Sequence, residues 1–308
     1  MIYKGKYHLK RLETQDFPAV KQIFWEVFNK KVSVSYLRNK YNTSYLGVGY
    51  IASIAYENET PVAFYGAIPQ KFSNDREGVF VAQACDSFTL KQCQGQGIHY
   101  QLAKLSYEFM KEIGIQCVYG FHSENTYYAT IKLGWKKHMH LERYSIKVPT
   151  LPLAKILNKV GLNATYDLFF KKETPKEALK KLRIDHKERF QQGLTPHFID
   201  YKNSFNNHYF FEANGCILWV KVVAIMMVGF FYAPSEIALQ KALSKLKRKA
   251  LMLGINQILF QIHPESTMAS QIKNIVTHKE SWLIGYLDFD ARINISDFLF
   301  TYADLDTY

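Results

Sequence analysis

In the first half of the chain, stretches whose apolar residues are spaced as in a strand alternate with stretches whose apolar residues are spaced as in a helix. Residues 7–12 alternate like a half-buried strand, and residues 14–28 place apolar side chains on one helical face. Further on, a strand over 78–90 runs directly into a short glycine-containing segment, and a helix over 98–113 follows it. This order of elements predicts a mixed α/β domain.

Weaker patterns complete this half. The remaining predicted elements are strands over 50–56, 61–68, 117–121 and 138–148 and helices over 33–41 and 125–133. The first two of these strands flank a polar turn, which predicts a hairpin. We therefore predict a first domain over residues 1–148.

Periodicity weakens over 149–207, where prolines interrupt a basic and partly helical stretch that we interpret as a connector. Regular patterns resume over 208–308, which we predict to be a second domain. Its predicted elements are strands over 208–232, 257–262, 282–289 and 298–302 and helices over 235–253 and 268–277.

The two halves resemble each other weakly. A glycine–isoleucine pair, an apolar strand and a His-x-Glu-x-Thr turn occur at 114–126 and again at 254–267. The order and the spacing agree to about one residue, and such self-similarity indicates a duplicated unit.

Residues 216–233 form the most apolar stretch of the chain and raise the question of a membrane helix. The stretch is marginally short for a span, and it contains Lys221 and Gly229. Its β-branched and aromatic residues favour two buried strands joined tightly, or one long bent strand. We expect no membrane span.

Composition adds a preference for anionic ligands. The chain has 39 Lys and Arg against 27 Asp and Glu, a net charge of +12, and the basic residues are spread along its length. This charge is compatible with a phosphorylated cofactor, and we expect no stable nucleic-acid partner. The 4 cysteines have no metal-ligand spacing and no signal peptide is expected, so a reduced, cytoplasmic protein without a metal is the simplest interpretation.

The most informative motif lies between the strand over 78–90 and the helix that follows it. It reads Gln92-x-x-Gly95-x-Gly97, and two glycines in three residues let backbone N–H groups approach a ligand closely. These donors stand at the positive end of the helix dipole, where a pyrophosphate binds well. Position 100 is Tyr, so the third glycine of a dinucleotide fingerprint is missing, and no Lys-Ser/Thr pair follows as in a Walker loop.

This segment resembles motif A of the Gcn5-related N-acetyltransferase (GNAT) superfamily, whose signature is Gln/Arg-x-x-Gly-x-Gly/Ala. Gly134-Trp135 is similar to the Gly-aromatic pair that closes the last motif of that family. The resemblance covers residues 1–148 well and 205–308 in outline, because Pro234-Ser235 stands where the second glycine loop belongs. It implies an α/β (α+β) fold of two GNAT-like domains, each a mixed, mostly antiparallel sheet flanked by helices, with a degenerate C-terminal copy.

The resemblance also implies where the acyl donor, most simply acetyl-CoA, would bind. Backbone amides of the loop would hold its pyrophosphate, and the end of the preceding strand would pair with the pantetheine and offer an N–H to the thioester oxygen. The residues implied in donor binding are Phe88, Thr89, Gln92, Gln94, Gly95, Gln96, Gly97, Ile98 and Asn125.

Catalysis requires a group that accepts a proton from the attacking amine. Asp86 occupies a position on the motif strand where many family members carry an acid, and Glu124 is the next candidate. Many members protonate the departing thiolate with a Tyr four residues before the Gly-aromatic pair, but that position is Thr130 here. Tyr128, which could also touch the leaving sulfur, is a candidate substitute, and so is Tyr127.

The sequence therefore predicts an acyl-CoA-dependent N-acyltransferase, most simply an N-acetyltransferase, that acts on a small-molecule or sugar amine by direct attack on the thioester. Two alternatives stay open. A Fem-like aminoacyl transferase that uses charged tRNA would suit the basic charge, although that chemistry does not require a CoA loop. A non-catalytic CoA-binding sensor would suit the missing tyrosine.

Overall fold

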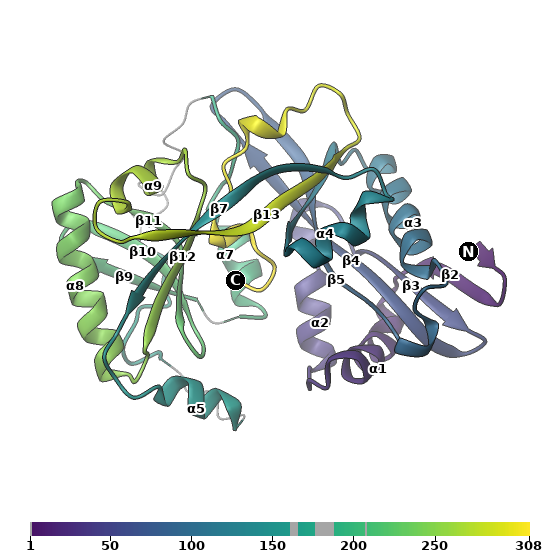
Figure 1. Cartoon of the computed structure of the whole chain (residues 1–308), viewed down its shortest axis with the longest axis horizontal. Helices are drawn as coiled ribbons and strands as arrows, with labels where there is room; N and C mark the ends of the chain where they lie inside the picture. The colour runs from purple at the N-terminus through teal and green to yellow at the C-terminus, as the bar shows by residue number, and fades with distance from the viewer. Residues whose placement is uncertain (1, 161–165, 176–187, 207) are drawn as a thin grey trace. The chain divides into compact units, whose positions relative to one another are not determined.

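The computed structural model describes residues 2–160, 166–175, 188–206 and 208–308 (Figure 1). The predicted connector over 149–207 therefore lies partly outside the described residues. The chain divides into two compact units. The first unit comprises residues 1–73, 77–138 and 283–295, and the second comprises residues 74–76, 139–282 and 296–308.

The first unit is built on a sheet with the strand order β1-β2-β3-β4-β5-β6-β13. These strands are β1 (Ile2–Lys4), β2 (Tyr7–Arg11), β3 (Ile51–Glu57), β4 (Thr60–Ser73), β5 (Gly78–Thr89), β6 (Cys117–His122) and the second half of β13 (His278–Asp288). The β5–β6 pair is parallel and the other neighbours are antiparallel. A parallel pair needs a long crossover connection, and α3 (Ile98–Glu112) makes it here.

Helices cover both faces of this sheet. Adjacent residues of a strand point to opposite faces, and Phe64 of β4 packs against Tyr41, whereas Tyr65 packs against Tyr107. Tyr41 ends α2 (Val34–Tyr41), and Tyr107 lies on α3. Helix α1 (Phe17–Phe28) packs with α2 against β4 and β5, so α1 and α2 share one face and α3 covers the other. Helix α4 (Glu124–Ile131) follows β6 directly.

The second unit repeats this connectivity. Its sheet has the order β7-β12-β11-β10-β9, and the β11–β12 pair is parallel while its other pairs are antiparallel. Its strands are β7 (Lys136–Lys147), β9 (His208–Ala213), β10 (Cys216–Val222), β11 (Met226–Tyr232) and β12 (Gln257–Ile262), and its helices are α5 (Leu153–Lys159), α7 (Pro196–Asn203), α8 (Glu236–Met252) and α9 (Thr267–Ile272). Helix α8 makes the parallel crossover and packs on β9, β10 and β12.

The predicted fold class, mixed and mostly antiparallel sheets flanked by helices, is confirmed. The apolar stretch over 216–233 forms the antiparallel strands β10 and β11, one of the two arrangements that the sequence left open. No helix in the described parts of the chain combines the length and the apolar character that crossing a bilayer requires.

The last predicted helix is present, but it ends at Ile272, five residues earlier than predicted. The predicted strand over 298–302 is wrong, because this segment makes only isolated bridges at Phe298 and Thr301 before a 3-10 turn. The reason is that this segment packs beside β11 and β12 instead of extending a sheet: the His263 N–H donates to the Phe300 carbonyl, and the turn contacts both strands.

Candidate functional site

The loop between β5 and α3 has the conformation that its glycines predict. Gly95 and Gly97 both have a φ of 76°, in the left-handed region where side chains are strained, and no described atom lies within 4 Å of a Cβ built at either position. Gly97 is the N-cap of α3, and no described side chain caps the helix there. The first N–H groups of α3 therefore remain open to an anion.

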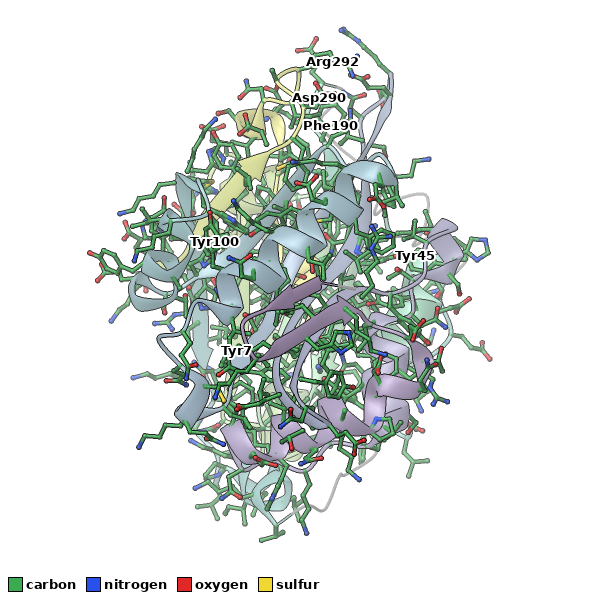
Figure 2. The ribbon with its side chains drawn as sticks, turned by 90° about the vertical axis from the view of Figure 1, so that its right-hand side faces the viewer. Tyr7, Tyr45, Tyr100, Phe190, Asp290 and Arg292 are labelled. Atoms are coloured by element: carbon green, nitrogen blue, oxygen red, sulfur yellow. The ribbon has the colours of Figure 1, made fainter. Side chains whose placement is uncertain are left out.

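The glutamines of the motif brace this loop. The Gln94 amide donates to the Thr89 carbonyl at 3.1 Å, and the Gln96 amide donates to the Gln92 carbonyl at 3.2 Å. Tyr7 of β2, labelled in Figure 2, donates to the Gln96 side-chain oxygen at 2.6 Å. These bonds fix the backbone and leave the helix N–H groups unused. Sequence reasoning did not include Tyr7, since β2 is far away along the chain.

The parallel strands β5 and β6 separate before the end of β5, the strand that leads to the loop. Their ladder runs from Val81 to Gln83 on β5 and stops there, although β5 continues to Thr89. Beyond this point the edge of β5 that faces β6 has no ladder partner among the described strands. An unpaired strand edge can accept an extended ligand through main-chain hydrogen bonds.

A β-bulge lies within this unpaired stretch. On the other side of β5, Cys85 pairs with Gly66 and Ser87 pairs with Tyr65, so Asp86 is the extra residue. Bulges commonly re-aim a residue beside an active site. Here the bulge turns the Asp86 side chain towards α2, on the α1–α2 face.

The Asp86 carboxylate is held by two residues of α2. The Lys40 ammonium lies 2.5 Å from its Oδ2, and the Tyr41 hydroxyl donates to the same oxygen at 2.7 Å. The Lys40 side chain is 3% exposed and that of Asp86 is 19% exposed. A carboxylate in this position balances a buried ammonium group.

The Phe88 side chain does not face a ligand. It is buried and packs against the rings of Phe24, Phe28 and Phe64, with centroids 5.2 to 5.7 Å apart. Any role of Phe88 in donor binding must therefore use its backbone.

The candidate catalytic and donor-binding residues on α4 differ in how far their side chains are exposed. The helix begins with a capping box between Ser123 and Thr126, which holds Glu124 at an exposed first turn. The Tyr128 side chain is 70% exposed, whereas Tyr127 is buried and donates to the Trp135 carbonyl. Asn125 belongs to the helix, but its side chain lies outside the described part of the structure.

Thr130 occupies the position at which many GNAT members carry the tyrosine that protonates the thiolate, and its side chain is hydrogen-bonded within α4. It is buried, and its hydroxyl donates to the Tyr127 carbonyl at 2.7 Å. Of the two tyrosines considered as substitutes, Tyr128 is the one whose hydroxyl can reach solvent or a ligand.

Sequence reasoning missed His122, the last residue of β6. Its side chain is buried between Tyr127 and Trp135, and its Nε2 has no hydrogen-bond partner among the described residues. Gly120 and Gly285 form a cross-strand pair, and a Cβ at either would lie 2.9 Å from the imidazole, so both glycines make room for the ring. Burial lowers the pKa of His122 to about 4, which keeps it neutral at pH 7.

A signal for His122 existed in the repeated His-x-Glu-x-Thr turns. The matching residue, His263, is also buried, but its Nδ1 accepts the Glu265 N–H at 3.2 Å and so belongs to a turn. The sequence pattern does not distinguish these two environments.

The described residues of the second unit contain no counterpart of the glycine loop that precedes α3. Its crossover helix α8 is capped by Ser235, whose Oγ accepts the Ala238 N–H at 3.2 Å. The chain's own C-terminal segment lies beside β11, where the Tyr308 ring occupies the space above Gly229 and its hydroxyl donates to the Trp219 carbonyl. Among the described residues, no group of three or more His, Cys, Asp or Glu side chains is placed to hold a metal ion.

No family model and no curated protein matches the sequence. Solved structures match the fold. A GCN5-related N-acetyltransferase from Kribbella flavida is 13% identical with a TM-score of 0.60, and the match covers 92% of this chain and 71% of that one. The N-myristoyltransferase of Saccharomyces cerevisiae, solved with bound myristoyl-CoA, is 10% identical with a TM-score of 0.57, covering 93% and 83%. The chain therefore has the GNAT fold, shared by N-acetyltransferases and N-myristoyltransferases.

Proposed function

We propose that the protein transfers an acyl group from acyl-CoA to an amine. The observation that carries this proposal is the open start of α3, where Gly95 and Gly97 expose backbone N–H groups beside the unpaired edge of β5. A diphosphate on the helix start and a pantetheine along the strand edge use both features. The comparison structures, which include a myristoyl-CoA complex, support the same class of donor.

The chemistry is direct attack on the thioester. The amine nitrogen bonds to the carbonyl carbon, and the resulting oxyanion is stabilised by a main-chain N–H of β5 near the bulge. Collapse breaks the carbon–sulfur bond, so the acyl group stays on nitrogen and CoA leaves as the thiol. One proton leaves the amine and one reaches the sulfur.

We propose Asp86 as the acceptor of the amine proton, directly or through water, and Tyr128 as the donor to the thiolate. The bulge brings Asp86 to the unpaired stretch of β5, and Tyr128 offers an exposed hydroxyl on the helix after β6. Glu124, also exposed on α4, is the second candidate base.

We further propose that the acyl group is acetyl and that the acceptor is a small-molecule or sugar amine. The α1–α2 side of β5 is filled by Tyr41, Phe64 and Phe88, and this packing favours a short acyl group over a long chain. Thiol release from acetyl-CoA and from longer acyl-CoAs, measured over a panel of amines, tests both parts.

Donor binding is tested by Gly97→Glu, which places a carboxylate where the diphosphate belongs. Isothermal titration of the variant with acetyl-CoA should show no binding. Gly47→Glu is the matched control, because Gly47 has the same φ of 76° and open surroundings but lies outside the loop. Normal affinity in Gly97→Glu would overturn the role of the loop.

Two outcomes would favour the other functions. If wild-type protein does not bind acetyl-CoA at all, a Fem-like reaction with charged tRNA gains support. If it binds tightly but no amine gives turnover above hydrolysis, a sensor role gains support.

A further inference from the structure

An exposed apolar patch lies at one end of the second unit. Its side chains are 45% to 73% exposed and come from α5, from the residues next to that helix and from the end of α8: Leu151, Leu153, Ile156, Val160, Leu251 and Met252. Single exposed apolar residues are normal on a protein surface, whereas a cluster of large ones marks an interaction site. We call this cluster the α5 patch.

Backbone contacts hold the two parts of the α5 patch together. The Ala154 N–H donates to the Gly254 carbonyl at 3.1 Å, and the Thr150 hydroxyl donates to the Leu251 carbonyl at 3.1 Å. A Cβ at Gly254 would lie 2.6 Å from the Leu153 Cβ, so the glycine lets α5 approach the end of α8 closely. Figure 1 shows α5 at the edge of the second unit, outside its sheet. The patch is therefore one continuous surface.

The apolar face of α5 is turned away from the core. Leu153, Ile156 and Val160 are three and four residues apart, so they share one face of the helix, and all three are exposed. The buried residue of α5 is Ala154, which lies against Gly254. An amphipathic helix normally buries its apolar face, but no described residue buries this one. The face is therefore suited to a partner outside the second unit.

Basic side chains accompany the α5 patch. Those exposed on the same two helices include Lys155, Lys159, Lys241, Lys245 and Arg248. The three on α8 are spaced by four and three residues, so they line one side of the helix that ends at Met252. The apolar surface is thus bordered by cations on both of its helices.

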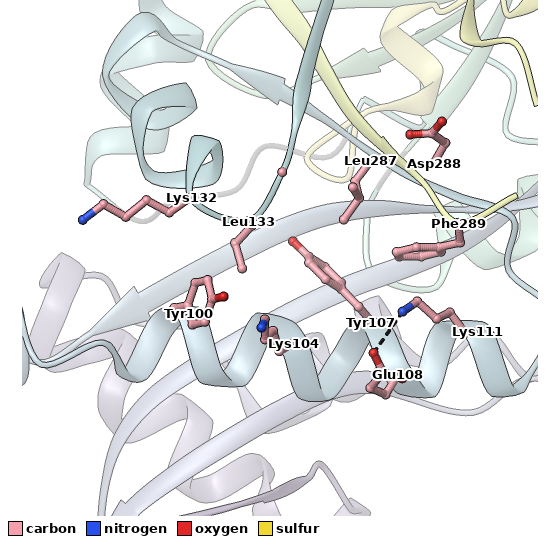
Figure 3. A pocket seen from close by; sticks show the side chains of 11 residues that line it. Tyr100, Lys104, Tyr107, Glu108, Lys111, Lys132, Leu133, Leu287, Asp288 and Phe289 are labelled. Carbon is pink, nitrogen blue, oxygen red and sulfur yellow. Dashed lines mark hydrogen bonds and ion pairs between the residues drawn. The ribbon is translucent and has the colours of Figure 1, made fainter. Parts of the chain in front are cut away.

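Acidic side chains do not balance this charge. The sequence contains no Asp or Glu over 149–166 or over 237–264, the stretches that carry the patch and these basic residues. The groove beside α3 in the first unit is different, because Lys111 there pairs with Glu108 at 3.0 Å (Figure 3). Exposed apolar groups bordered by uncompensated cations suit a partner that is apolar inside and anionic at its surface.

We propose that the α5 patch binds the surface of an anionic lipid bilayer. Helix α5 lies in the plane of the interface, with its apolar face at the boundary of the acyl chains and with Lys155 and Lys159 at the lipid phosphates. Lysine stems cover apolar surface while their ammonium groups reach the headgroups, which suits this position. The inference does not rest on the proposed function, because it concerns a surface of the second unit alone.

A second copy of the chain fits this surface less well. In a two-fold dimer the same patch meets itself, so Lys155 and Lys159 of one protomer would approach the same residues of its partner. Like charges that meet across an interface are costly, and the patch offers no acid to separate them. A bilayer with anionic lipid supplies both the apolar interior and the counter-charge.

The test measures co-sedimentation of the full chain with lipid vesicles. One set of vesicles contains phosphatidylcholine and phosphatidylglycerol in equal amounts, and the other contains phosphatidylcholine alone. We expect binding to the anionic vesicles that falls steeply with added salt, and little binding to the neutral ones. The reason is that each basic residue near an anionic surface strengthens binding about fivefold.

Two double variants test the two components of the patch. Ile156→Gln/Met252→Gln should weaken binding to anionic vesicles about tenfold or more, because it removes apolar surface that enters the bilayer. Lys155→Gln/Lys159→Gln should weaken it about twentyfold. All four side chains are exposed, so both variants should fold. Ile237→Gln is the matched control, because Ile237 is 65% exposed on α8 but about 22 Å from Met252 along the helix axis.

The proposal is overturned if wild-type protein binds neither kind of vesicle, or if both double variants bind anionic vesicles as wild-type protein does. A dimer in analytical ultracentrifugation that Ile156→Gln/Met252→Gln dissociates would instead make the patch an interface between copies of the chain. Binding of a polyglutamate peptide but not of vesicles, lost in the same variants, would assign the patch to an acidic protein segment and also overturn the proposal.

Discussion

The Lys40 ammonium and the Asp86 carboxylate form an ion pair at 2.5 Å, with the lysine side chain 3% exposed. Lys40 is the penultimate residue of α2, whereas Asp86 is the bulged residue of β5. Breaking a buried pair on one side leaves the other charge without compensation, which is far more costly than removing both. The pair therefore fixes α2 against the bulge whether or not Asp86 takes part in chemistry.

We predict that Asp86→Asn lowers the acyl transfer rate about 10²- to 10⁴-fold, the usual contribution of a general base, with unchanged affinity for acetyl-CoA. The same variant should lose about 3 to 5 kcal/mol of stability because Lys40 loses its counter-charge. Rates from a thiol-release assay and unfolding in urea measure the two effects separately.

The double variant Lys40→Met/Asp86→Asn separates the effect on the acyl transfer rate from the effect on stability. It should recover most of the stability, since no buried charge remains, but none of the activity. Recovery of the wild-type rate would show that Asp86 only holds α2 in place.

His122 should make the protein less stable in mild acid. The pKa of its imidazole is about 4 in the folded protein against an ordinary value of 6.5, so the unfolded chain binds the proton first as the pH falls. Stability is therefore lost between pH 6.5 and 4 and levels off below that window. Between pH 7 and 5 the loss due to His122 should be about 2 kcal/mol.

The measurement compares urea unfolding of wild-type protein and His122→Gln at both pH values. His208, which is also buried with its pKa lowered by burial, contributes equally to both proteins and cancels. An identical pH dependence in the two proteins would show that His122 is not held neutral by its surroundings.

Local sequence patterns predicted most of the first unit because its strands, glycine loop and crossover helix carry strong signals. The buried face of α3 was harder to predict. Leu102, Leu105, Phe109 and Ile113 have the apolar spacing of a core-facing stripe, but the last three are half-buried, while Ser106 and Tyr107 are buried instead. Ser106 shares a hydrogen bond with Ser53, and Tyr107 shares one with Tyr65 and accepts another from the Trp135 indole N–H. These bonds make the burial of both residues favourable, and such partners are not visible in apolar spacing.

For the candidate site, the sequence predicted the loop but not what surrounds it. The strained conformation of Gly95 and Gly97 follows from residue type, so the motif alone indicates it. The contacts of Lys40 with Asp86 and of Tyr7 with Gln96 join segments 46 and 89 residues apart. No local pattern encodes such pairs, and the same holds for the glycines that enclose His122.

We predict that each chain binds one molecule of acyl-CoA. The crossover helix of the second unit begins with a Ser235 cap, and the C-terminal segment lies along β11, so neither feature of the first site is available there. Isothermal titration should give a stoichiometry of one, and Gly95→Glu should abolish all binding. Residual binding of one equivalent in that variant would reveal a second site outside the first unit.

Gly229→Ala should strongly destabilise the second unit, because an added Cβ would lie 2.2 Å from the Tyr308 ring. Overpacking of this kind typically costs about 1 to 3 kcal/mol, and here the Tyr308 hydroxyl bond to the Trp219 carbonyl restricts any shift of the ring. In a Tyr308→Ala background the same substitution should cost little, since the ring is gone. A double-mutant cycle by urea unfolding measures this coupling directly, and additive effects of the two substitutions would place the Tyr308 ring away from β11.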